Sequence, residues 1–203
     1  MKLPCALAPA LLLAGCITTE IASQTAPEFR DHRFVRTMVV ADVGMLHDRT
    51  LAEDLIVGRL TDRRVDALRS LDVVFGADTL PEEAFLDHAA NAGADAVLIL
   101  RVREEGATGR AAPPSTNTFV VTDGEGDVKS TTTTQVYGMG PVWPWATYRA
   151  SLVETATGRT AWFADVTTDG TSSSSPSDLV RSVAAKVAEQ ALKDGVLKVE
   201  QRL

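Results

Sequence analysis

Cysteine thiols are the side chains of this sequence best suited to covalent chemistry, because a thiolate is both a nucleophile and a metal ligand. The sequence holds two cysteines, Cys5 and Cys16, and both lie within the first 16 residues. The rest of the sequence therefore offers no disulfide, no thiolate metal site and no cysteine nucleophile. Any thiol chemistry belongs to the N-terminal segment.

Cys16 follows Leu13-Ala14-Gly15, and these four residues resemble the bacterial lipobox at every position. The signal peptidase of lipoproteins needs small residues before its cut, and the lipid is carried by a nucleophilic sulfur. The resemblance implies cleavage between Gly15 and Cys16, a diacylglyceryl group on the Cys16 sulfur and acylation of the new α-amine. Each buried CH₂ contributes about 0.8 kcal/mol, so two or more acyl chains form a stable membrane anchor.

Residues 1–15 are typical of a signal peptide. A short positive region, Met1-Lys2, precedes an apolar run that is shorter than the roughly 20 residues a spanning helix needs. The alternative is an ordinary secretory signal cut after Ala8-Pro9-Ala10, which would leave a very short apolar region. Ile17 stands where an Asp would retain a lipoprotein at the inner membrane, and this favours the periplasmic face of the outer membrane.

Other motifs that could carry chemistry are weak. The three histidines, His32, His47 and His88, are scattered, so we expect no metal site. The acidic segment 123–127 lacks the later Gly and Glu of a calcium loop and favours a hairpin turn. The sequence contains no Gly-x-Ser-x-Gly, Walker A or Gly-x-Gly-x-x-Gly motif. We therefore expect no catalysis and no cofactor apart from the covalent lipid on Cys16.

One polar turn is a candidate ligand site. His47, Asp48 and Arg49 follow the first predicted strand, and ligands of open α/β sheets bind at the carboxyl ends of strands. This pattern leaves open a hydrolase or small-ligand site at the turn. The other interpretation is that Asp48 caps the helix that follows, with two surface neighbours.

A group of aromatic residues lies among glycines and prolines near the middle of the chain. Tyr137, Trp143 and Trp145 surround the segment 138–144, with Tyr148 close by. Aromatic side chains in such a setting are typical of recognition surfaces. They could equally fold back over an open edge of a sheet, and the sequence leaves both interpretations open.

Alternating blocks of strand and helix patterns run along the chain. The first half predicts strand, helix, strand, helix, strand, and the second half predicts a Gly- and Pro-rich insertion, a hairpin and a last helix. This order is the signature of an α/β domain with a mixed sheet, three layers, about five to six strands, three helices and an inserted β-hairpin. The predicted strands cover residues 34–43, part of 65–75, 94–102, 148–155 and 159–169; the helices cover about 49–62, 81–92 and 177–193; the insertion covers 106–145.

Composition and charge limit the classes of partner. The chain has 203 residues with 45% hydrophobic residues, which suits one globular domain, and a formal net charge of −7. An acidic body argues against nucleic acid and against a polybasic membrane surface. The polar residues 16–33 show no period, so we predict a flexible tether there, followed by a single domain over residues 34–203.

The layout resembles a broad group of bacterial envelope lipoproteins of unknown function. The resemblance rests on the lipobox, an early acid pair, a Gly-Ala-Asp-Ala-Val-Leu strand, the insertion and a Thr-Gly-x-x-x-Trp hairpin, which here are residues 13–16, 53–54, 93–98, 106–145 and 157–162. The domain is similar to the TolB N-terminal and curli-secretion-lipoprotein kind. The resemblance implies a small α/β fold and a place in the envelope.

These observations predict a membrane-anchored binding or assembly module without catalytic activity. Its partners would be the membrane, through the lipid, and an envelope protein or a second copy of the chain. Self-assembly into an oligomer is an alternative form of the same function. We expect the contact region in the insertion, around Trp143 and Trp145.

Overall fold

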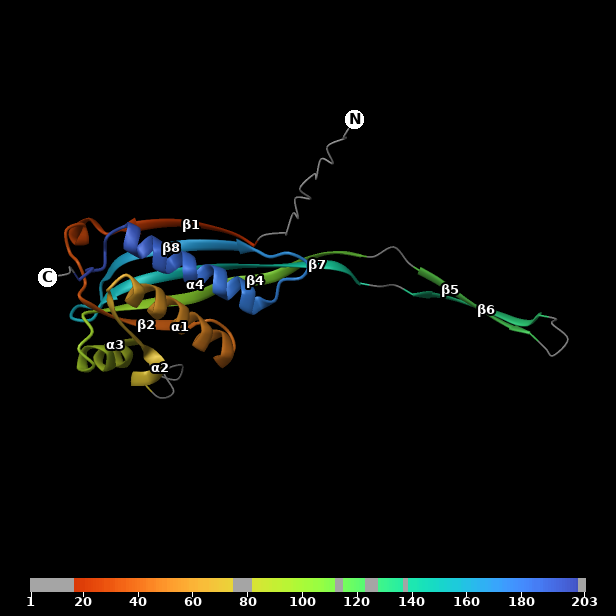
Figure 1. Cartoon of the computed structure of the whole chain (residues 1–203), viewed down its shortest axis with the longest axis horizontal. Helices are drawn as coiled ribbons and strands as arrows, with labels where there is room; N and C mark the ends of the chain where they lie inside the picture. The colour runs from red at the N-terminus through yellow and green to blue at the C-terminus, as the bar shows by residue number, and fades with distance from the viewer. Residues whose placement is uncertain (1–16, 75–81, 112–114, 123–127, 137–138, 201–203) are drawn as a thin grey trace, which may run out of the picture.

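The computed structural model describes residues 17–74, 82–111, 115–122, 128–136 and 139–200; side chains at 82–83 and 110–140 are not described. Figure 1 shows a curved sheet with helices packed on it and a long two-stranded arm. In chain order the elements are β1 (Thr18–Thr25), the 3₁₀ helix η1 (Pro27–Phe29), β2 (Arg36–Asp42), α1 (Leu46–Asp62), β3 (Asp66–Arg69), α2 (Ser70–Val73), α3 (Glu82–Asn91), β4 (Ala96–Ala111), β5 (Ser115–Thr122), β6 (Val128–Val136), β7 (Met139–Glu154), β8 (Thr160–Asp169) and α4 (Pro176–Lys193).

Six strands form the main sheet in the order β1-β8-β7-β4-β2-β3, and β5 pairs with β6. The β2 strand is parallel to β3 and β4, whereas β4, β7, β8 and β1 pair antiparallel. The predicted α/β class with a mixed sheet and an inserted hairpin is confirmed. The single-turn helix α2 was not predicted, because four residues are too few to show a helical period.

Helices cover both faces of the sheet, which makes the three layers. On the front face, α1 and α4 pack over Val39, Leu98 and Leu152, all fully buried. On the back face, α3 packs Phe85 and Ala89 against a smaller cluster that includes Met38, Val97 and Ile99. Successive residues of a strand point to opposite faces, so the continuous apolar runs in β2 and β4 are explained by burial on both sides.

The helix ends follow local chemistry. Ser175 caps α4 in a capping box, in which its side chain accepts from the Asp178 backbone N–H and the Asp178 carboxylate accepts from the Ser175 backbone N–H. Gly93, two residues after α3, has φ +80°, a left-handed conformation that glycine adopts without steric cost. These two signals explain why α3 and α4 were predicted close to their observed positions.

The flexible tether predicted over residues 16–33 is wrong for the described residues 17–33. Residues 18–25 form β1, which pairs with β8 along its whole length. The Thr19 hydroxyl bonds Ser182 of α4 over 2.7 Å and Thr168 of β8 over 2.8 Å. Phe29 of η1 is buried. The polar composition of β1 misled the prediction, because Ile21 is the single apolar side chain among its inward residues and Thr19 and Ser23 are held by hydrogen bonds.

The predicted insertion at residues 106–145 divides into two parts. Residues 106–111 and 139–145 are ordinary continuations of β4 and β7, which pair as far as Ala111 and Met139. Beyond them, β5 and β6 continue as a separate antiparallel pair, so that the arm projects from one end of the sheet (Figure 1). The acidic segment 123–127 lies outside the described residues.

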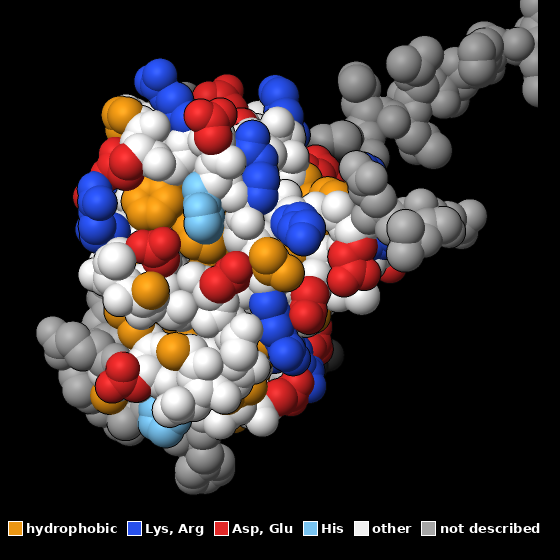
Figure 2. All heavy atoms as spheres, turned by 90° about the vertical axis from the view of Figure 1, so that its left-hand side faces the viewer, with side chains coloured by type: hydrophobic (Ala, Val, Ile, Leu, Met, Phe, Trp, Pro, Cys, Tyr) orange, Lys and Arg blue, Asp and Glu red, His pale blue; other side chains and the backbone are white. Residues whose placement is uncertain are grey.

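The other end of the molecule has a mixed surface. Figure 2, viewed from the side away from the arm, shows Lys and Arg side chains interspersed with Asp and Glu. Figure 1 places the C-terminal end of α4 and η1 at this same end. Interspersed charges of both signs are typical of a solvated surface.

Candidate functional site: the end of the sheet that carries the arm

Three strands bring the start of the described chain next to the base of the arm. Thr18 of β1 pairs with Asp169 of β8, and Asp169 pairs with Trp145 of β7. Ile17, the residue before β1, packs against the core. Cys16 and Gly15 lie outside the described residues, but Cys16 directly precedes Ile17 in the chain. The described chain therefore begins beside the base of the arm.

The two tryptophans at this end differ in burial. They lie two residues apart on β7 and so on the same face of the strand, the back face. A Cβ added to Gly106 would meet the Trp145 ring at 2.8 Å, so the half-buried indole lies directly against the β4 backbone. Trp143 is 41% exposed and its neighbour Val142 is 38% exposed. Trp145 thus covers the sheet, and Trp143 is available for contact. Tyr137, the third predicted aromatic, lies outside the described residues.

The predicted site of His47, Asp48 and Arg49 does not converge. Consecutive helical residues point about 100° apart, and α1 begins at Leu46, so all three lie inside the helix. His47 is exposed, whereas the Asp48 carboxylate is buried and accepts a hydrogen bond from the Ser177 hydroxyl of α4. Arg49 Nε lies 3.6 Å from Glu53 Oε1.

Asp48 is therefore not the cap of α1, whose N-cap residue is Met45. The carboxylate lies in the first turn, where the helix dipole favours a negative charge, and it joins the starts of α1 and α4. The sequence could not show this role, because Ser177 is 129 residues away. Tyr148 lies near the same carboxylate. Burial, and then the charges of Glu105 and Asp48, together raise the pKa of Tyr148 to about 12.

Glu53 is a fully buried carboxylate that serves the fold. Its oxygens accept hydrogen bonds from the Ala41 backbone N–H at 3.1 Å, the Ser70 hydroxyl at 2.7 Å and the Leu71 backbone N–H at 3.1 Å. The β2–β3 ladder ends at Val39 and Arg69, so Ala41 lies beyond the last paired residue of β3. The Glu53 carboxylate thus accepts the Ala41 hydrogen bond in place of a longer β3, and it also binds the first two residues of α2. This arrangement is structural.

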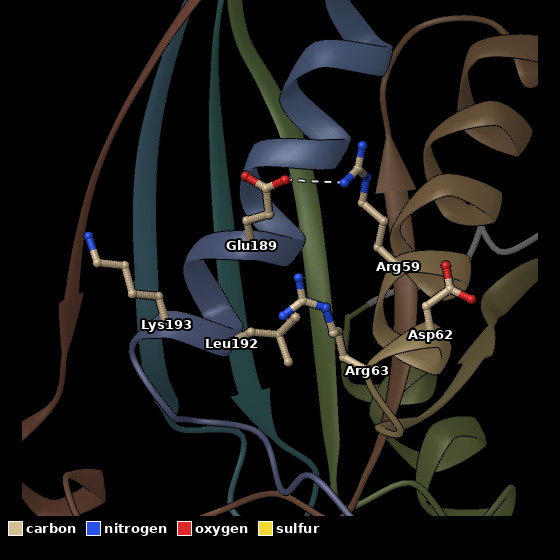
Figure 3. Close-up of a pocket in the computed structure, with 6 residues that line it drawn as sticks. All are labelled: Arg59, Asp62, Arg63, Glu189, Leu192 and Lys193. Atoms are coloured by element: carbon tan, nitrogen blue, oxygen red, sulfur yellow. Dashed lines mark hydrogen bonds and ion pairs between the residues drawn. The ribbon is translucent and has the colours of Figure 1, made fainter.

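A cleft of about 530 Å³ lies between the C-terminal halves of α1 and α4. Figure 3 shows Arg59 and Arg63 extending from α1 toward α4, where Arg59 Nη1 meets Glu189 Oε1 at 3.1 Å. Lys193 extends to the other side of α4. Cations near helix C-termini are favoured by the helix dipole. The cations of the cleft therefore stabilise the helix ends. Because Asp62 and Glu189 also line it, the cleft has no single sign of charge.

No three His, Asp or Glu side chains in the described ranges come close enough together to hold a metal ion. None of the described helices is both long and apolar enough to cross a membrane.

The comparisons with known proteins identify a shared fold. No family model and no curated protein matches the sequence. Among solved structures, the PelC dodecamer from Paraburkholderia phytofirmans is similar, with 18% identity, a TM-score of 0.50 and coverage of 89% of this chain and 99% of that chain. A single-substitution variant of that dodecamer gives 16% identity and a TM-score of 0.51, over 89% of this chain and 100% of that chain. Lipoprotein GNA1162 from Neisseria meningitidis gives 15% identity and a TM-score of 0.44, over 78% and 99%.

The resemblance to TolB N-terminal and curli-secretion-lipoprotein domains stays a prediction. The conclusion that these comparisons support is that this chain has the α/β fold of PelC.

Proposed function

We propose that this protein is a lipid-anchored module of the bacterial envelope that works by assembly rather than by catalysis. Cys16 is its anchor, the membrane is the periplasmic face of the outer membrane, and the arm end of the sheet is its contact region. The lipobox pattern supports the anchor. The residues that suggested a hydrolase, His47, Asp48 and Arg49, point in different directions from α1. Asp48 accepts a hydrogen bond from Ser177 of α4, and Arg49 lies beside Glu53 of its own helix.

The observation that carries the proposal is the length of β4 and β7. Each has 16 residues, whereas β2 has 7 and β8 has 10. The β2 strand pairs with β4 only as far as Arg101, and β8 pairs with β7 only from Trp145 onward. In the described ranges, no strand pairs with the outer edges of β4 and β7 beyond those points. Unpaired strand edges accept further strands, so the arm provides a surface for strand addition by a partner.

The structure of β1 supports an orientation for the module. With Ile17 alone between Cys16 and β1, a lipid on Cys16 would hold this end of the sheet against the membrane rather than away from it. The half-exposed Trp143 lies just beyond the pairing of Thr18, Asp169 and Trp145. Tryptophan is enriched at membrane–water interfaces, because its amphipathic ring suits the level of the lipid headgroups. We infer that Trp143 contacts the lipid headgroups.

The partner we favour is a second copy of the same chain. PelC, which shares the fold, was solved as a dodecamer. A heterologous contact between the arm edge of one copy and the sheet edge of the next would form a ring if the rotation closes. The edge strands β1 and β3 of the main sheet provide the complementary edges.

Disulfide crosslinking in intact cells tests the assembly. Cys16 is the sole cysteine after processing at the lipobox, and its sulfur carries the lipid, so added cysteines report their own contacts. Because the proposed contact joins two different edges, the test combines Thr108→Cys, on the exposed part of β4 at the arm, with Glu20→Cys on β1 or Asp66→Cys on β3 in the same chain. The control combines the same edge cysteines with Ala156→Cys, in the exposed β7–β8 turn at the opposite end. We expect disulfide-linked species from at least one combination with Thr108→Cys and none from the combinations with Ala156→Cys. Equal crosslinking with both partners, or none with Thr108→Cys, would contradict assembly through the arm.

A further inference from the structure

Charged residues form a row across the back face of the sheet. By strand register, Asp42 of β2 stands beside Arg101 of β4, Arg101 beside Arg149 of β7, and Arg149 beside Asp165 of β8. The two outer pairs have opposite charge, and the central pair consists of two arginines. Like charges directly opposite each other on neighbouring strands destabilise a sheet. A local conflict of this kind is expected where a surface serves function.

The geometry of Arg149 is fixed by its neighbours. Its Nε and Nη2 atoms donate to the two carboxylate oxygens of Asp165 at 2.7 and 2.8 Å, which is a bidentate pair. Its guanidinium carbon lies 5.3 Å from the centre of the Phe163 ring. A guanidinium held in this way is positioned in advance, and its remaining N–H groups stay available to a ligand.

A third arginine joins the central pair. Arg103 lies at the β-bulge between Val102 and Glu104, where the register of β4 with β7 shifts. Residues two apart on a strand share a face, and Arg103 lines the same hollow as Arg101 and Arg149. Its charge acts on Asp165: the hydrogen bond from Arg149 lowers the pKa of that carboxyl most, and the charges of Arg149 and Arg103 lower it further.

The hollow itself has a volume of about 160 Å³. Three arginines, Ser151, Thr160 and two aliphatic residues line it. None of the described residues that line it is acidic, although the whole chain has a formal net charge of −7. Its polar lining residues therefore offer charged guanidinium donors and neutral hydroxyl donors. This combination is suited to binding an oxyanion.

We propose that this hollow is a binding site for a phosphate group, with Arg101, Arg103 and Arg149 as its cationic ligands and Ser151 and Thr160 as hydroxyl donors. The bound group is either a free phosphate ester or the phosphate of a lipid headgroup, because both present the same oxygens. A second hollow beside it, lined in part by Glu104 and Thr147, is open to solvent and admits the rest of such a ligand. Arg149 lies four residues from Trp145 along β7, about 13 Å at 3.3 Å per residue.

Calorimetric titration of the mature lipidated protein in nonionic micelles at low ionic strength tests this site. The probes are inorganic phosphate, glycerol 3-phosphate and short-chain phosphatidylglycerol. We expect saturable binding of at least one probe. Equal affinity for the two soluble probes indicates a soluble ligand, and binding of phosphatidylglycerol alone indicates a headgroup; both results support the phosphate site.

Matched variants locate the binding. Arg103→Gln removes one cation from the hollow, and we expect it to weaken binding about tenfold or more, because a hydrogen bond to a charged group is among the stronger ones. Arg59→Gln, on the exposed surface between α1 and α4, changes the net charge equally and should leave the affinity unchanged. No saturable binding of any probe, or the same loss in both variants, would overturn the proposal. Circular dichroism spectra of both variants establish that they are folded.

Discussion

The Trp162 indole nitrogen donates a hydrogen bond of 2.7 Å to the Oδ2 atom of Asp194, just after α4. The same oxygen accepts from the Ser23 hydroxyl of β1 at 2.6 Å, and Oδ1 accepts from the Gln190 amide at 2.9 Å. Trp162 is fully buried. One carboxylate therefore joins β1, β8 and α4, and it fixes the strand that leads to Cys16.

Replacing Asp194 by Ala should destabilise the protein. The Trp162 N–H would lose its acceptor inside the core, and an unsatisfied buried donor costs about 1–3 kcal/mol. Urea unfolding monitored by tryptophan fluorescence measures the free energy of unfolding. The control Asp62→Ala, on the exposed end of α1, should change it by less than about 0.5 kcal/mol. Equal effects of the two variants would show that the Asp194 bonds contribute nothing specific.

Glu53→Gln should lower the free energy of unfolding more than Asp54→Asn does. The three groups around Glu53 all donate, so an amide would place its own N–H groups against at least one of them. We expect a loss of about 2 kcal/mol or more in the free energy of unfolding. The adjacent Asp54 pairs with Arg69 at the surface, where ion pairs contribute about 0–1 kcal/mol. A similar small effect at both positions in urea unfolding would refute the role given to Glu53.

The phenol of Tyr148 should ionise at a pH well above the pKa of an ordinary tyrosine. Its pKa is raised to about 12, first by burial and then by the charges of Glu105 and Asp48. The native state therefore favours the neutral phenol, and this contribution to stability is present below the unfolded pKa of about 10 and is lost as pH rises through 12. Absorbance at 295 nm in a Tyr137→Phe variant isolates Tyr148. A midpoint near 10 in folded protein would contradict its burial.

Gly106→Ala should disturb the base of the arm, whereas Gly109→Ala should not. The added methyl group would meet the Trp145 ring at 2.8 Å in the first case, and Val142 at an ordinary 3.5 Å in the second. We expect Gly106→Ala to push the Trp145 ring off β4 and shift its fluorescence emission to the red, best seen in a Trp143→Phe background. An unchanged spectrum would show that the indole does not rest on Gly106.

The predicted elements that match the structure carry their signal locally. The apolar stripe and the Pro-Ser-Asp start of α4 lie within one segment, and so do the continuous apolar runs of β2 and β4. The β1 strand has no such signal, because the polar side chains of Thr19 and Ser23 are held by Thr168, Ser182 and Asp194, which lie more than 140 residues away. A hydrogen bond between distant segments leaves no period in the sequence.

The candidate sites also depend on contacts between distant segments, which the sequence does not show. The Asp48–Ser177 bond depends on the parallel packing of α1 and α4, and the facing of Arg101 and Arg149 depends on the register of β4 with β7. Neither relationship follows from spacing along the chain, since strand order and register are set by the whole fold. The aromatic cluster was visible in the sequence, but its division into a covering Trp145 and an exposed Trp143 required the sheet.

Native mass spectrometry of the protein extracted from its own membrane tests the proposed function most directly. We predict subunits that begin at Cys16 and carry covalent lipid, in particles whose mass is a multiple of the subunit mass. Shortening the arm should reduce these particles to monomers while the lipid remains. Subunits without lipid, or lipidated subunits that are monomeric at every concentration, would contradict an anchored assembly module.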